Sequence, residues 1–146
     1  MEDELFNASE SGNLQRAQHL VEQNVDKNAS NSWRSTALHI SAGNNHLNIV
    51  QYLIEQGADK EARDDDGRTP LYRAAACGNV NIVQYLVEQG ADKESRNNDG
   101  WTPLHVSAIY NKFDIIQYLV QQGADLTACT NRNKTSHQFC AELEVY

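Results

Sequence analysis

The chain has 146 residues, 40% of them hydrophobic, and a formal net charge of −8 at pH 7. This length corresponds to one domain, and the acidic balance argues against nucleic acid as a partner, because nucleic-acid binders usually present a basic surface. No apolar run approaches the roughly 20 residues of a membrane-spanning helix, and the acidic start of the sequence, MEDE, is unlike the basic start of a signal peptide. We therefore expect a cytoplasmic protein that binds neither nucleic acid nor a membrane.

A block of residues returns at a fixed interval along the chain. Threonines open it at four positions, each 33 residues from the next: Thr36, Thr69, Thr102 and Thr135. Gly-Ala-Asp recurs with the same period, at 57–59, 90–92 and 123–125. A fixed period of this length indicates a stack of similar small units rather than a globule around one enclosed core.

The first unit is expected to cap the stack. Counting back by one period places residues 3–6 (DELF) on the threonine block and Gly12 on the glycine between the helices of a unit. Asn24 replaces the glycine that ends the second helix, and asparagine tolerates the left-handed backbone conformation required there. The acidic residues 2–4 suit a helix N-terminus, whose partial positive charge favours anions.

A helix is predicted to open each later unit, as the unit that starts at Thr69 shows. Thr69 is a good N-cap residue, and Pro70 suits the first helical position, where its missing N–H would have no partner anyway. Leu71 and Ala75 then repeat at helical spacing. The small residues on this face allow the next unit to approach closely.

A second helix is predicted over residues 80–87, where apolar residues cover a wide arc. Gly78 separates it from the first helix, and Gly90 is expected to end it in the left-handed conformation. Residues 91–100 are polar and end in Asn-Asp-Gly, which is typical of a hairpin. Each unit is therefore predicted to be helix, turn, helix and a projecting hairpin.

The order Thr-Pro-Leu-His/Tyr-x-x-Ala, Ile-Val-x-x-Leu, Gly-Ala-Asp and Asp-Gly before the next Thr resembles the ankyrin repeat, over residues 36–135. The resemblance implies one all-α domain, a solenoid of stacked helix-turn-helix units with projecting β-hairpin loops. Four repeats and a partial C-terminal capping helix are expected, with these boundaries: 1–34, 35–67, 68–100, 101–133 and 134–146.

The residues that look chemical fit structural roles better. His39 and His105 recur with the repeat, and the resemblance implies that such a histidine bridges the first helix to a neighbouring loop. Cys77, Cys129 and Cys140 form no CxxC pair, which fits reduced thiols. No catalytic set, metal cluster or phosphate-binding loop is recognisable. We expect no enzyme activity and no cofactor.

The run of aspartates at residues 64–66, before Gly67, invites a calcium interpretation. An EF-hand loop would place Ala62 at its first ligand position, where it cannot bind the ion. A solvated loop tip is the simpler prediction, and the alternative is an acidic contact for a lysine or arginine of a partner.

Repeated residues serve the stacking, so partner selection is expected at positions that break the repetition. In ankyrin-like arrays the hairpin tips and the adjoining face of the first helices form a concave binding surface. Register with the repeat places these candidate partner-binding residues there: Trp33, Ser35, Asn44, Asp65, Asp66, Arg68, Arg73, Cys77, Asp99, Trp101, Tyr110 and Arg132.

Trp101, Tyr110 and Arg68 form the strongest predicted group, because exposed Trp, Tyr and Arg dominate binding energy at protein interfaces. The alternative for Trp101 is packing onto the next hairpin.

The sequence thus predicts a monomeric, non-enzymatic protein–protein interaction module, a scaffold or adaptor that binds a partner segment with basic and apolar residues. Two alternatives remain: a small stand-alone inhibitor that blocks a partner enzyme, and a fragment of a larger scaffold protein.

Overall fold

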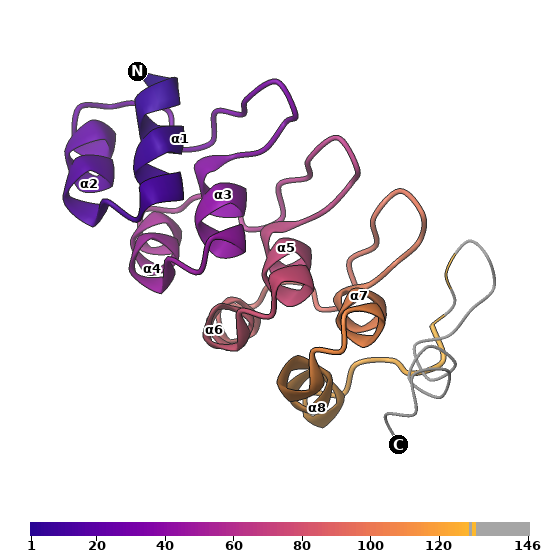
Figure 1. Ribbon diagram of the computed structural model, residues 1–146. Coiled ribbons are helices and arrows are strands. Elements are labelled where there is room, and N and C mark those ends of the chain that lie inside the picture. Colours follow the sequence, from indigo (N-terminus) through magenta and orange to yellow (C-terminus); the bar gives the residue numbers. More distant parts are fainter. Residues whose placement is uncertain (129, 131–146) are drawn as a thin grey trace.

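Four helix pairs follow one another along the chain in the computed structural model, which describes residues 1–128 and 130. Figure 1 shows the pairs in sequence order from the N-terminus, with the loops between them projecting toward one side. The pairs are α1 (Glu2–Ser11) with α2 (Leu14–Glu22), α3 (Ala37–Gly43) with α4 (Leu47–Glu55), α5 (Pro70–Cys77) with α6 (Val80–Glu88), and α7 (Pro103–Ile109) with α8 (Phe113–Gln121). The predicted all-α repeat solenoid is confirmed, and the predicted C-terminal capping helix, 134–146, lies outside the described residues.

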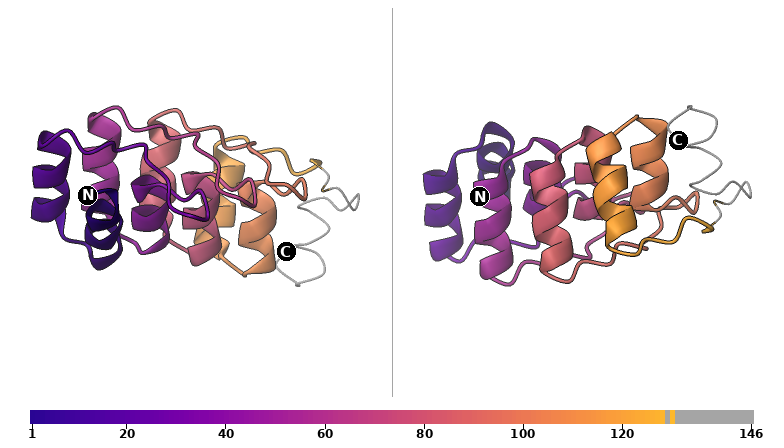
Figure 2. Two further views of the ribbon diagram at one scale, coloured as in Figure 1. Left: turned by 90° about the horizontal axis from the view of Figure 1, so that it is seen from above. Right: turned by 90° about the horizontal axis from the view of Figure 1, so that it is seen from below.

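The helices form two parallel rows (Figure 2). The first helices of the units, α1, α3, α5 and α7, pack on one another in order, and the second helices, α2, α4, α6 and α8, do the same. Small side chains make the close approach of the first row possible: Ala37, Ala42, Ala74, Ala75 and Ala108 are each 0% exposed.

One leucine per unit marks the core between the two rows. Leu20, Leu53, Leu86 and Leu119 share one repeat position, and all are fully buried. These leucines belong to one cluster of buried residues that extends from the first described unit to the last, so the core runs the length of the described stack instead of closing on itself.

The first helices begin as predicted. Thr36, Thr69 and Thr102 are their N-caps, and each side chain accepts a hydrogen bond from the backbone N–H three residues later. The first unit differs, because α1 begins at Glu2 with Met1 as its N-cap, two residues before the register predicts. Its first turn is acidic, as expected, and Asn24 has the predicted left-handed conformation, with a φ of 63°.

His39 links its helix to the next loop. Its Nδ1 accepts from the Thr36 backbone N–H at 3.2 Å, and its Nε2 donates to the Arg68 carbonyl at 2.8 Å. Burial lowers the pKa of His39 and outweighs the opposing effect of the Arg68 carbonyl, so the ring stays neutral. The bridging role that the resemblance implied for this histidine is confirmed.

The projecting loops are also tied to each other. The side chains of Asn28, Glu61 and Glu94 accept hydrogen bonds, all 2.9 Å long, from the backbone N–H groups of Asp59, Asp92 and Asp125 in the following unit. Regular β pairing is sparse, since the described loops contain only an isolated antiparallel bridge between Ser30 and Thr36. No helix in the described part of the chain is long and apolar enough to cross a membrane.

The stacked core yields a stability test. Leu86→Ala is expected to lower the free energy of unfolding by about 2–5 kcal/mol, the usual loss for a buried leucine. Leu20→Ala, at the same repeat position in the first unit, should cost less, because a middle unit supports neighbours on both sides. Urea unfolding of both variants measures the two losses, and equal losses would argue against a linear stack.

Candidate functional site

The same side-chain turn builds each of the three described loop tips between the units. The Oδ1 atom of Asn31 accepts from the backbone N–H groups of Trp33 and Ser35, both at 3.0 Å. Asp64 and Asn97 make the equivalent pairs of bonds, at 2.9–3.0 Å. Asn and Asp favour such turns because their short side chains reach the backbone two residues on. The repeat therefore fixes where each tip residue sits.

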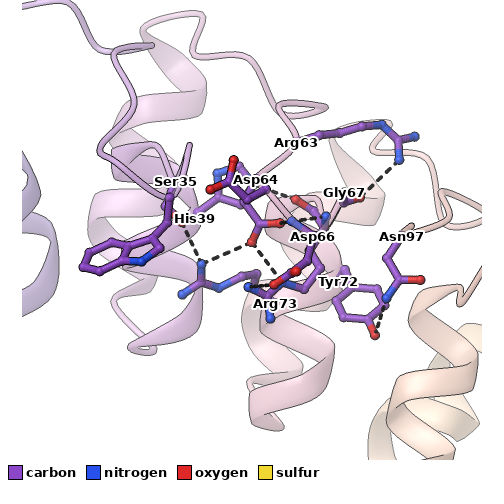
Figure 3. A network of polar contacts seen from close by, with 12 residues as sticks. Ser35, His39, Arg63, Asp64, Asp66, Gly67, Tyr72, Arg73 and Asn97 are labelled. Carbon is purple, nitrogen blue, oxygen red and sulfur yellow. Dashed lines mark hydrogen bonds and ion pairs between the residues drawn. The ribbon is translucent and has the colours of Figure 1, made fainter. Parts of the chain in front are cut away.

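Asp64 differs from its counterparts Asn31 and Asn97 in carrying a charge. Its side chain is buried, and its second oxygen, Oδ2, accepts from Arg68 Nε at 2.9 Å and lies 3.5 Å from Arg73 Nη1. Figure 3 shows the Asp64 carboxyl group and Arg73, whose Nη1 also donates to the Ser35 hydroxyl at 3.0 Å. The predicted solvated tip is thus wrong for Asp64, because the two guanidinium groups and the backbone replace water around it.

Two opposing effects act on the Asp64 carboxyl. Burial raises the pKa of Asp64. The hydrogen bonds from Arg68 and its positive charge together lower the pKa by more than burial raises it, so the net pKa falls below the ordinary value of 3.8. Arg68 is in addition paired with the exposed Asp66, whose Oδ2 lies 2.9 Å from Arg68 Nη2. Carboxylates of one loop, Asp64 and Asp66, therefore hold both the Arg68 guanidinium group and that of Arg73 on α5.

A hollow of about 340 Å³, which we name the Trp33 lobe, lies between the loop tips and the first helices. Seven predicted residues line it: Trp33, Ser35, Asn44, Asp65, Asp66, Arg68 and Arg73. Trp33 is 69% exposed, the largest exposure among the big hydrophobic residues of the described chain. Glu10, Asn31 and Ile40 complete the lining and were not predicted. Glu10 is one period before Gly43, so extending the register into the capping unit finds it.

A second hollow of about 270 Å³, the Tyr110 lobe, adjoins the first through Arg68 and Arg73, which line both. Its other lining residues are Tyr72, Ala76, Cys77, Val106 and Tyr110. Tyr110 is 57% exposed, and Cys77 is an exposed free thiol. Burial raises the pKa of Tyr72 to about 12, so its hydroxyl stays protonated and accepts a hydrogen bond from Asn97 Nδ2 at 3.2 Å. We call the two lobes together the loop–helix groove.

The remaining predicted residues lie elsewhere. Trp101 is partly buried, packs against the core and lines neither lobe, so it does not join Arg68 and Tyr110 in one cluster. Asp99 is exposed on the last described tip, and Arg132 lies outside the described residues. The position of Trp101 agrees with the alternative prediction that this side chain packs within the stack. The exposed tryptophan in the groove is Trp33.

The groove is lined by charged and aromatic side chains. Within residues 1–128 and 130, no group of three or more His, Cys, Asp and Glu side chains could hold a metal ion. The groove offers instead ordered guanidinium groups, exposed aromatic rings and carboxylates.

The buried carboxylate gives a pH-dependent prediction. Asp64→Asn keeps the turn, as Asn31 and Asn97 do, but removes the charge that pairs with both arginines. At pH 7 we expect a loss of about 1–3 kcal/mol in the free energy of unfolding, the usual range for a charge-assisted bond. Because folding lowers the Asp64 pKa, this contribution is complete above the ordinary pKa of 3.8 and is lost as pH falls through the folded-state value.

Urea unfolding at pH 7, 5 and 3 measures the gap in stability between wild type and Asp64→Asn, which should be widest at pH 7 and 5 and narrower at pH 3. Asp65→Asn is the control, because this neighbouring carboxylate is exposed, and it should change stability little at any pH. A gap that persists unchanged at pH 3 would contradict the assigned charge pairing.

The two tryptophans should respond differently to truncation. Trp101→Ala removes a ring packed against the core and is expected to cost about 1–3 kcal/mol of stability. Trp33→Ala removes a largely exposed ring and should change stability by at most about 0.5 kcal/mol. Thermal unfolding followed by circular dichroism compares them, and the reverse order would overturn both placements.

Comparison with known proteins agrees with the repeat architecture. A family model described as "Ankyrin repeats (3 copies)" matches residues 5–97, and one described as "Ankyrin repeat" matches residues 99–131. No curated protein matches the chain in a sequence search. The two matched segments cover most of the chain, and the structure repeats the same helix pair through both. The chain therefore belongs to the ankyrin repeat family.

Proposed function

We propose that this chain is a non-enzymatic protein–protein interaction module that binds a segment of a partner protein along the loop–helix groove. Ankyrin repeats generally mediate protein–protein interaction. The observation that carries the proposal is the exposure of Trp33 and Tyr110 in the two lobes of one continuous groove, with Arg68 and Arg73 between them. Such a module acts as a scaffold or adaptor.

The arginines are prepared for binding before a partner arrives. Arg68 is held by Asp64 and Asp66, and Arg73 by Asp64 and Ser35. Immobilising a long side chain at an interface ordinarily costs about 0.5–1.5 kcal/mol. Because the protein fixes both guanidinium groups itself, much of this loss falls on folding rather than on binding.

The residue types in the groove match those that contribute most to interfaces. Tryptophan, tyrosine and arginine are enriched among residues whose truncation weakens binding by about 2 kcal/mol or more. The acidic side chains beside them favour a partner segment that carries basic as well as apolar residues. We assign no role in binding to Trp101, because a ring packed against the core has little area left to offer.

Affinity purification with the whole chain as bait, followed by mass spectrometry, tests the proposal. Partners captured by the wild type should be lost with Trp33→Ala/Tyr110→Ala, and the dissociation constant of a purified partner should rise at least about 30-fold. Circular dichroism verifies that the variant is folded.

Gln117→Ala is the matched surface control, because Gln117 is exposed on α8 and lines neither groove lobe. Partners that tolerate the groove variant but are lost with Gln117→Ala would move the binding surface to the second helices. An activity assay on any captured enzyme distinguishes an inhibitor from an adaptor.

A further inference from the structure

The two lobes of the groove differ in charge. The Trp33 lobe is lined by the carboxylates of Glu10, Asp65 and Asp66 and by Arg68 and Arg73. The buried Asp64 stands behind the two arginines and pairs with both. Four carboxylates therefore face two guanidinium groups, and the lobe keeps a negative surplus. The acidic side of the groove is its α1 end.

The surplus belongs to Glu10 and Asp65. Asp66 and Asp64 are already paired with arginines, whereas neither Glu10 nor Asp65 forms an ion pair in the described part of the chain. The Asp65 backbone N–H donates to the Trp33 carbonyl at 3.0 Å, so this carboxylate and the indole belong to adjacent tips. Glu10 lies in the last turn of α1, where the helix contributes partial negative charge.

An exposed indole and two unpaired carboxylates that line the same hollow have the chemistry of a cation site. The face of a tryptophan ring attracts a positive charge more strongly than that of any other aromatic side chain, and the two carboxylates add Coulombic attraction. The neighbouring guanidinium groups of Arg68 and Arg73 are paired with Asp64 and Asp66, so they offset this attraction less than free cations would.

The Tyr110 lobe has the opposite character. No acidic side chain lines it, and its walls are the rings of Tyr72 and Tyr110 with the small side chains of Ala76, Cys77 and Val106. Arg68 and Arg73 are the only charged side chains that line it, so nothing in this lobe attracts a cation. An apolar side chain fits this lobe best.

We propose that the groove binds a partner segment through two subsites. The Trp33 lobe takes a single lysine or arginine side chain, between the indole and the carboxylates of Glu10 and Asp65, and the Tyr110 lobe takes an apolar side chain. Between them, N–H groups of Arg68 and Arg73 that Asp64, Asp66 and Ser35 do not use donate to carbonyl oxygens of the segment. This assignment rests on the proposed function and adds the order of the partner's residues along the stack.

A displayed library of random 12-residue peptides, selected on the whole chain, tests the assignment. Enriched peptides should contain a lysine or arginine together with an apolar residue. An enriched peptide is then synthesised with a fluorescent label, and a second version carries norleucine, which lacks the charge, in place of its basic residue. Anisotropy titration gives the dissociation constant of each peptide at low and moderate salt.

Glu10→Gln/Asp65→Asn should weaken the basic peptide by about tenfold or more and should leave the norleucine peptide unaffected, because the lost partner charge is already absent. Glu55→Gln/Glu88→Gln is the matched control. It changes the net charge equally, and its residues are exposed on α4 and α6, so we expect less than a twofold change.

The outcomes separate the two proposals. The cation subsite is overturned if the enriched peptides depend on Trp33 but show no preference for a basic residue. It is also overturned if they lose as much affinity with the control pair as with Glu10→Gln/Asp65→Asn. Either result leaves the groove as the binding surface. Binding that is unchanged by Trp33→Ala/Tyr110→Ala overturns the groove itself. Failure to enrich any peptide sensitive to Trp33→Ala counts against both proposals.

Discussion

Each helix pair of this protein buries its apolar face against the neighbouring pair, and the rest of the structure depends on that contact. The fully buried leucines at one repeat position and the small alanines of the first helices make the pairs stackable at a constant spacing. Because a stack has no enclosed centre, its loops and first helices are left along one side as a continuous surface. The loop–helix groove lies on this surface, so its position is a consequence of how the core is built.

Asparagine and aspartate at the same repeat position make the same turn, but only the aspartate adds a charged oxygen. Asn31, Asp64 and Asn97 form the same turn with one oxygen. Only Asp64 places a charged oxygen on the other side, and that oxygen gathers the guanidinium groups of Arg68 and Arg73. The buried charge is tolerated because the arginines and two backbone N–H groups satisfy it. One unit of the stack therefore carries two ordered guanidinium groups, each paired with a carboxylate.

The acidic character of the whole chain and the chemistry of its groove point in the same direction. On the proposed function, a net charge of −8 would attract basic partners over a distance of about a Debye length. Close contact would then depend on the carboxylates of Glu10 and Asp65, which form no ion pair in the described residues, and on the exposed rings of Trp33 and Tyr110. Long-range attraction and local selection are separate physical effects here, and different residues carry them.

The 33-residue period by itself determined the number and order of the described helices, the threonine caps of α3, α5 and α7, and the left-handed turn at Asn24, because these depend on residues a few positions apart. It also identified most residues of the groove through their place in the unit. Only the tertiary structure decided that Asp64 is buried and that Trp101 packs against the core while Trp33 is exposed. A register states where a residue stands within its repeat, whereas burial and charge pairing depend on side chains contributed by the neighbouring repeats.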